Sequence, residues 1–178
     1  MKPFRRQIRR FARDTRGQLS IEAALMFPLL VWVYIATFTF FETYRADSTN
    51  VKAAYAVSDM LSRQTDPVGQ VQIDGMRDVF RYMTLAKQAP WIRVSVVGFD
   101  GNTGKFVLKW SNASTGHQPA LLEDLEPHIP AMTPGDSVIV VETYMPYTPE
   151  FKVGLSSFTF RNIVVTRPRF APQLLWAS

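Results

Sequence analysis

One carboxylate stands out in this sequence because of its neighbours. Glu22 immediately precedes an apolar run, and it follows a basic N-terminal segment that ends at Gly17. A charged side chain at the edge of a membrane-length helix is energetically costly, so its presence indicates a specific role. An unpaired charge is strongly unfavourable in a low dielectric, and the chemistry that Glu22 offers is therefore pairing with a positive charge. The alternative is a glutamate that reaches the headgroup boundary and has no function in assembly.

The sequence nominates no catalytic residue. The chain has no cysteine, which excludes a disulfide framework, a thiolate metal site and a cysteine nucleophile. The motif G-x-S-x-G, which marks one class of serine hydrolase, does not occur. We therefore expect a protein that is not an enzyme and that needs no cofactor.

Two groups of polar residues have side chains of the types that bind metal ions. The stretch Asp100–Gly104 is similar to the opening of a calcium loop, but an EF-hand requires a glutamate at its twelfth position, which here is Ser111. A hairpin turn is the better interpretation. The second group matches no metal-binding spacing and is interpreted as a solvated face. Its members are Glu123, Asp124, Glu126 and His128. No metal site is predicted.

Four aromatic residues on predicted strands admit two interpretations. They form either a binding surface or part of the core, and aromatic residues on strands are mostly core. The four are Trp91, Trp110, Tyr144 and Tyr147.

The element that positions Glu22 is a predicted transmembrane helix. Nineteen residues without a charge, Ala23–Phe41, follow the glutamate. A helix of that length is ~28 Å long, close to the hydrocarbon thickness of a bilayer. Pro28 lies inside the run, and a proline within a membrane helix is tolerated. A cleaved secretory signal is the competing interpretation, but its apolar core would be about 7–15 residues long, and the following FFETYRADS offers no convincing cleavage site.

The positive charge of the chain is concentrated at its N-terminus. The net charge is +5, but residues 1–17 contain seven basic residues and one acidic residue, so the remainder sums to −1. The basic character belongs to this segment alone, and nucleic-acid binding loses its main support. By the positive-inside rule, we expect a single-pass protein with its N-terminus in the cytoplasm and the bulk of the chain outside.

The spacing of Gly17 and Glu22 resembles the prepilin cleavage motif of the type IV pilin superfamily, in which a basic leader ends in glycine and a glutamate stands five positions later. The resemblance implies cleavage between Gly17 and Gln18 by a prepilin peptidase, which would leave 161 of the 178 residues. It also implies that Glu22 pairs with the new α-amino group of Gln18 in a neighbouring subunit. Within one chain that amino group lies roughly one helical turn from the carboxylate.

A second pattern narrows the resemblance. The run E-A-A-L-x-x-P-L-L, Glu22–Leu30, looks like that of TadE-type minor pseudopilins of the tight-adherence (Tad/Flp) pilus system, and TadF-type siblings share the leader. In this family the implied helix-packing residues are Leu25, Pro28 and Leu29. The closing stretch Arg167–Gln173 is also similar to TadE-like proteins.

The resemblance implies a function in assembly of a Tad/Flp-type pilus, from the bacterial inner membrane, with the C-terminal domain in the periplasm. The protein would lie at the tip of the pilus, at its base, or only in the assembly complex. The implied partners are the prepilin peptidase, other Tad pilins and pseudopilins, the inner-membrane assembly platform and the lipid bilayer, with no nucleic acid. Two other classes stay open: an uncleaved, membrane-anchored periplasmic sensor or ligand-binding protein, and an exported enzyme.

The chain is expected to divide into a leader (1–17), a transmembrane helix (18–45) and an extracytoplasmic pilin-like domain (46–178). The first helix is predicted to continue to about Arg63, and the predicted fold class is α+β, with an antiparallel sheet of about four strands and the helix over one of its faces. The further predicted elements are helices near 74–88 and 120–126 and strands at 91–100, 104–113, 136–147 and 157–168.

Overall fold

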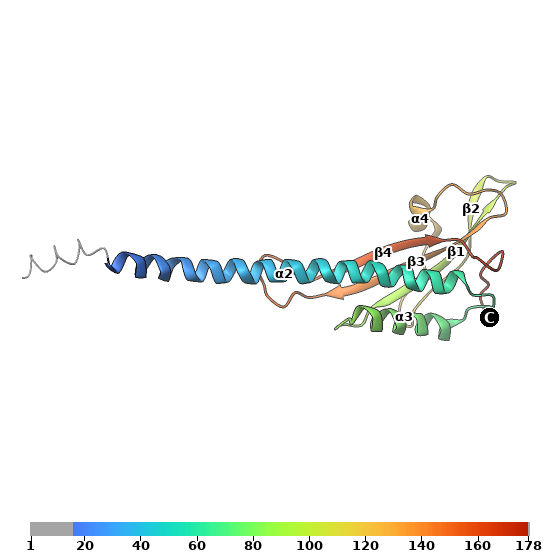
Figure 1. The fold of residues 1–178 in the computed structure, drawn as a ribbon. Coiled ribbons are helices and arrows are strands. Elements are labelled where there is room, and N and C mark those ends of the chain that lie inside the picture. The colour runs from blue at the N-terminus through green and yellow to red at the C-terminus, as the bar shows by residue number, and fades with distance from the viewer. Residues whose placement is uncertain (1–15, 178) are drawn as a thin grey trace, which may run out of the picture. The chain divides into compact units, whose positions relative to one another are not determined.

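The computed structural model describes residues 16–177, with side chains described from residue 21 onward. It confirms the predicted α+β class, with one long apolar N-terminal helix and a four-stranded antiparallel sheet (Figure 1). The helical elements are α2 (Arg16–Ser62), α3 (Gln70–Thr84), α4 (Leu122–Leu125) and the 3-10 turn η1 (Glu126–His128), and the strands are β1 (Trp91–Asp100), β2 (Lys105–Ala113), β3 (Ser137–Tyr147) and β4 (Phe158–Thr166).

The chain divides into two compact units. The first, called the helical unit here, comprises the part of α2 up to Glu42 together with Glu150–Gly154. The second, called the sheet unit, comprises Thr43–Pro149 and the chain from Leu155 onward. Helix α2 thus contributes residues to both units, and the short segment between β3 and β4 is assigned to the helical unit although both strands belong to the sheet unit.

The second helix lies four residues earlier than predicted at each end. Its N-terminus is fixed at Gly69, whose backbone N–H donates to the side chain of Gln72 at 3.0 Å. Its C-terminus is fixed by Leu85, which adopts the left-handed conformation with φ of 51°. A left-handed residue ends a helix because the next N–H turns back to an earlier carbonyl, here from Ala86 to Arg81. The predicted continuation to residue 88 was therefore wrong.

The predicted acidic helix at 120–126 is shorter in the structure. Only α4 is α-helical, and the chain tightens into η1 at Pro127, because proline has no backbone N–H to continue an α-helical ladder. The four predicted strands are all confirmed, with their ends within two residues of the observed ones.

The sheet has the strand order β2-β1-β3-β4, and every neighbouring pair is antiparallel. Residues directly opposite each other in such a sheet project to the same face. Arg93 on β1 lies opposite Glu142 on β3, and Trp91 lies opposite Tyr144. The β1–β2 ladder has one irregularity, between Val96 and Val97. The register therefore brings side chains together that are about fifty residues apart in sequence.

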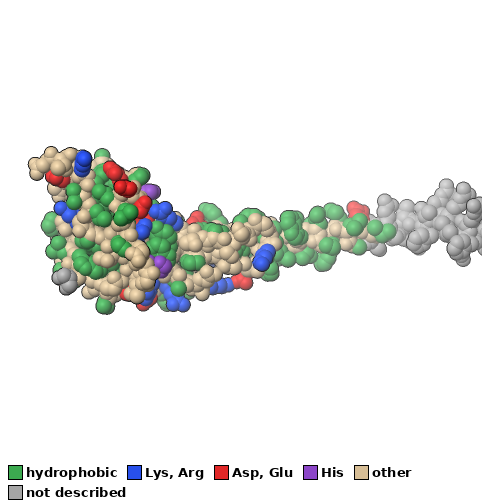
Figure 2. Space-filling view, turned by 180° about the vertical axis from the view of Figure 1, so that it is seen from behind, with side chains coloured by type: hydrophobic (Ala, Val, Ile, Leu, Met, Phe, Trp, Pro, Cys, Tyr) green, Lys and Arg blue, Asp and Glu red, His purple; other side chains and the backbone are tan. Residues whose placement is uncertain are grey.

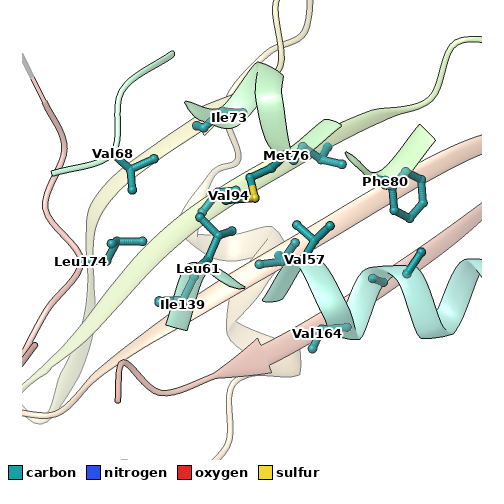
Figure 3. Packing of buried hydrophobic residues seen from close by; sticks show 14 of the residues in the cluster. Val57, Leu61, Val68, Ile73, Met76, Phe80, Val94, Ile139, Val164 and Leu174 are labelled. Carbon is teal, nitrogen blue, oxygen red and sulfur yellow. The ribbon is translucent and has the colours of Figure 1, made fainter. Parts of the chain in front are cut away.

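One face of the sheet packs against the helices of the sheet unit. Small and branched residues of α2, among them Val57 and Leu61, contact strand residues such as Val94 and Ile139 (Figure 3). Helix α3 adds Ile73, Met76 and Phe80 to the same cluster. Met83, which was predicted on the buried side of this helix, is 39% exposed, because the helix ends one residue later. The remaining members of this cluster are Ala53, Ala54, Val68, Ile92, Val96, Val141, Met145, Val164 and Leu174.

The opposite face of the sheet is covered over part of its area by the connection between β2 and β3. Val138 and Val140 of β3 pack with Ala120 and with Leu125 of α4. The rest of this face carries the polar residues that are opposite each other on β1, β3 and β4. The two faces thus differ, since the helix-covered face is mainly apolar, with Thr143 and Asn162 as polar exceptions, and the other is apolar only at one end.

Residues 167–177, called the C-terminal strap here, hold the sheet unit together at one edge of the core. Arg169 forms an ion pair with Asp59 of α2 at 2.9 Å, and the carbonyl of Leu174 accepts a hydrogen bond from the indole of Trp110 at 2.8 Å. Arg169 of the strap is thus linked to α2 by this ion pair.

Candidate functional site

The residues singled out by the sequence lie in the N-terminal part of α2. Gly17 and Gln18 fall within this helix, and their side chains lie outside the described ones. Glu22, Leu25 and Leu29 are exposed. Because positions 18, 22, 25 and 29 are three or four residues apart in a regular helix, they share one face. The helix thus places the bond predicted to be cleaved and Glu22 about one turn apart on the same side.

Pro28 lies within this segment, and α2 continues through it as helix. Proline has no backbone N–H, so the carbonyl of residue 24 lacks its usual intrahelical donor. Lipid offers no hydrogen bond to replace the missing one, whereas a polar group from a neighbouring helix does. The proline is therefore compatible with a helix that packs against another helix.

The helical unit exposes apolar side chains in every direction. From Ile21 to Tyr34 each residue of α2 is exposed, including Phe27 at 68% and Trp32 at 58%. Figure 2 shows hydrophobic side chains along the surface of this helix. By length and composition the helix is sufficient to cross a membrane. An exposed apolar surface of this extent needs a membrane or a protein partner to cover it.

The sheet unit contains a buried carboxylate that the sequence analysis missed. Glu142 on β3 is fully buried, and its two oxygens accept hydrogen bonds from Nε and Nη2 of Arg93 at 2.6 and 2.9 Å. Arg161 on β4 and the hydroxyl of Tyr144 donate to the same carboxylate at 3.0 and 2.9 Å. These four side chains form one connected network across three strands. The signal in the sequence was a glutamate inside the otherwise apolar strand SVIVVETYM.

This network determines the ionisation of its members. Burial by itself would raise the pKa of Glu142, but the hydrogen bonds from Arg93, Arg161 and Tyr144 and the charge of Arg93 outweigh burial and hold the pKa below its ordinary value. Burial and the hydrogen bond to the carboxylate raise the pKa of Tyr144. A carboxylate that is fully buried and satisfied by these donors acts as a structural ion pair. It is poorly suited to serve as a general base.

A stack of three aromatic rings borders the network. The ring of Trp91 lies 3.7 Å from the ring of Tyr144 and 4.3 Å from the imidazole of His117, nearly parallel to both. The guanidinium of Arg161 lies 5.7 Å from the centre of the Tyr144 ring. His117 is exposed, so one end of the stack reaches the surface. This is the part of the sheet unit whose residue types best fit a ligand contact.

The other two aromatic residues considered in the sequence lie elsewhere. Trp110 packs with Trp176, with ring centres 5.2 Å apart, next to the helix-covered core. Tyr147 contacts Phe158 and Phe160. The four aromatic residues therefore contribute to three separate groups and do not make one binding surface.

The turn after β1 is a hairpin turn built around Asp100. Its carboxylate accepts hydrogen bonds from the backbone N–H of Asn102 and the hydroxyl of Thr103, both at 2.9 Å, and Gly104 adopts φ of 66°. These hydrogen bonds lower the pKa of Asp100. Among the residues that the structure describes, no group of three or more histidine, aspartate or glutamate side chains is placed to hold a metal ion. Glu123, Asp124, Glu126 and His128 are all exposed.

Comparisons with known protein families, with curated proteins and with solved structures find no match to this chain.

Proposed function

We propose that this chain is a membrane-anchored, TadE-like minor pseudopilin that functions in assembly of a Tad/Flp-type pilus. The observation that carries the proposal is the position of Glu22, five residues after Gly17 and directly before an exposed apolar helix. The helix supports it, because positions 18, 22, 25 and 29 share one face. On this proposal the N-terminus is cytoplasmic, the sheet unit is periplasmic, and the protein is not an enzyme.

Assembly would proceed through charge pairing and helix packing. Cleavage after Gly17 creates an α-amino group at Gln18, and a positive charge among packed apolar helices requires a partner. Glu22 of a neighbouring subunit supplies that partner, and the apolar surface around Leu25, Pro28 and Leu29 packs the two helices together. The carboxylate thereby fixes the axial register between subunits.

The N-terminal mass of the membrane-extracted protein tests this proposal directly. We expect a chain that begins at Gln18 when the host's prepilin peptidase is present and at Met1 when it is absent. A chain that begins at Met1 in both hosts would contradict the proposal and favour the anchored sensor.

A second experiment tests the assembly function of Glu22. We expect Glu22→Ala to abolish pilus assembly and to leave membrane insertion intact, since the helix keeps its apolar length. Glu123→Ala is the matched control, because it removes an exposed carboxylate from the sheet unit. Wild-type piliation of the Glu22 variant would contradict the assigned function.

The alternative is an uncleaved, membrane-anchored sensor or ligand-binding protein. One observation favours it, namely the ring stack of Trp91, Tyr144 and His117, whose end is exposed. Aromatic faces and a neighbouring guanidinium are common in ligand sites. Replacement of His117 by Ala would then impair signalling without affecting N-terminal processing.

A further inference from the structure

The connection between β3 and β4 belongs to the helical unit. Its residues Glu150–Gly154 group with α2 up to Glu42. The side chains of α2 are exposed from Ile21 to Tyr34, but Ile35 and Ala36 are half-buried. Thr39 is only 3% exposed. One side of the last two turns of the apolar run is therefore covered, whereas the other side is exposed, with Phe38 at 45% and Phe40 at 53%.

The part of the helix in which every side chain is exposed is too short by itself to cross a bilayer. The fourteen residues from Ile21 to Tyr34 span ~21 Å, whereas the hydrocarbon core of a bilayer is about 30 Å thick. About twenty helical residues are needed, so a span that begins just after Glu22 ends near Phe41. That end lies at the turns that are covered on one side. A bilayer of ordinary thickness therefore reaches the level of residues 150–154.

The charges in the first turns of α2 oppose any shift of the helix that would move residues 150–154 away from the membrane. Such a shift would draw Glu22 toward the hydrocarbon, followed by Arg16. Each charged residue at the centre of a membrane helix costs about 2.5–3.5 kcal/mol on insertion scales. The carboxylate of Glu22 thus marks one boundary of the span, and the turns that are covered on one side lie at the opposite boundary.

The segment itself has the composition of an interfacial loop. Phe151 is 46% exposed, Lys152 beside it is exposed, and Val153 is half-buried. An aromatic ring favours the boundary between headgroups and acyl chains, and a lysine reaches lipid phosphates. The loop is not helical, and hydrated headgroups satisfy its backbone polar groups where hydrocarbon would not.

The end of β3 contacts α2 just after the apolar run. Within the sheet unit, the hydroxyl of Tyr147 at the end of β3 lies 3.2 Å from the hydroxyl of Thr43, two residues after Phe41. Tyr44, the next residue of α2, is 73% exposed. Tyrosine side chains at such a position are typical of membrane–water interfaces.

We propose that Glu150–Gly154 is a second membrane contact, with Phe151 at the boundary of the headgroups and acyl chains and Lys152 among the lipid phosphates. The partner is the phospholipid surface of the leaflet where α2 leaves the bilayer. This inference rests on the proposed membrane anchoring by α2.

The depth of single nitroxide labels tests the contact, and the absence of native cysteine makes each label unique. Full-length Phe151→Cys, Lys152→Cys, Leu29→Cys and Phe170→Cys variants are labelled and reconstituted into vesicles of phosphatidylethanolamine and phosphatidylglycerol. Power saturation then compares contact with oxygen, which concentrates in lipid, and with a nickel chelate, which stays in water. Leu29 is the control within the span, and Phe170, 69% exposed on the C-terminal strap, is the control on the sheet unit.

We expect the label at position 29 to contact oxygen and not the chelate, and the label at 170 to contact the chelate freely. The labels at 151 and 152 should be intermediate, with 151 deeper than 152. If 151 and 152 behave like 170 while 29 stays in lipid, the loop contact is wrong and the anchoring stands. If the loop labels contact neither agent, they are buried in protein and the contact is also wrong. If position 29 is also aqueous, the anchoring itself is wrong.

Discussion

Two parts of α2 carry apolar side chains in opposite environments. Between Ile21 and Tyr34 every side chain is exposed, whereas Ala53, Ala54, Val57 and Leu61 are completely buried. Both parts present apolar residues at helical spacing, so hydrophobicity does not distinguish them. The difference is the partner, because the second part has a sheet of this chain against it and the first part does not. Burial inside the chain follows where the chain supplies a complementary surface.

The two parts also differ in the size of their side chains. The second part faces the sheet with alanine, serine and valine, and small residues let a helix approach another surface closely. The first part carries Phe27, Trp32 and Tyr34, all exposed. Lipid chains adapt to large side chains, whereas a packed protein interface requires matched volumes.

The largest expected effect contrasts two leucines of this helix. Leu61→Ala removes a fully buried side chain, and the resulting cavity should lower the free energy of unfolding of the sheet unit by about 2–5 kcal/mol. Leu29→Ala is the matched substitution in the exposed part and should leave that free energy unchanged. Urea unfolding of the full chain in detergent, followed by tryptophan fluorescence, measures both. Equal effects of the two substitutions would contradict the division of the helix.

The next expected effect contrasts two glutamates. Glu142→Gln removes the charge that pairs with Arg93 and Arg161. Because the Arg161 side chain is 47% exposed and glutamine keeps one acceptor oxygen, the loss should be about 1–3 kcal/mol, below that of a fully buried ion pair. Glu22→Gln changes an exposed residue and should not alter the stability of the sheet unit. The same unfolding experiment at neutral pH compares the two variants.

The pH dependence of the stability effect of Glu142→Gln provides a further test. The pKa of Glu142 is lower in the folded protein than its ordinary value of 4.5, so its stabilising effect is fully present above that value and is lost as the pH falls through the folded pKa. The stability difference between wild type and Glu142→Gln should therefore shrink below about pH 4.5. A difference that stays constant down to pH 2 would exclude ionisation as its origin.

The smallest expected effect concerns a third leucine. Leu85 holds the left-handed conformation with φ of 51° and is 80% exposed, so its side chain contributes little burial to offset the backbone strain. Glycine adopts this conformation without steric cost, and Leu85→Gly should stabilise the sheet unit by about 0.5 kcal/mol. Thermal unfolding detects a shift of that size. Destabilisation similar to that of Leu61→Ala would show that Leu85 packs against a partner.

The fold could be predicted because its signals are local. Alternating β-branched and aromatic residues predicted the four strands, and the Gly101-Asn102-Thr103 turn predicted the hairpin of β1 and β2. The ends of α3 could not be predicted equally well. They depend on the side chain of Gln72 as a cap and on a leucine in a conformation that usually requires glycine.

The candidate sites also differ in whether their residues are close together in the sequence. The prediction for Gly17 and Glu22 rests on spacing, because the two residues are only five positions apart in the sequence. The pairing of Arg93 with Glu142 depends on strand register, and one residue of slip would move Glu142 to the other face. The stack of His117 on Trp91 likewise requires the path of the connection after β2, which has no periodic signal.

The sequence by itself determined the order of helices and strands, the charge asymmetry and the apolar length of the first helix, since each depends on neighbouring residues. Tertiary structure alone decided which part of that helix is covered. It also decided that a carboxylate in β3 meets two guanidinium groups and that residues 150–154 join the helical unit. The physical reason is that burial and charge pairing depend on distances through space, and the chain path fixes those distances only when the whole sheet unit has folded.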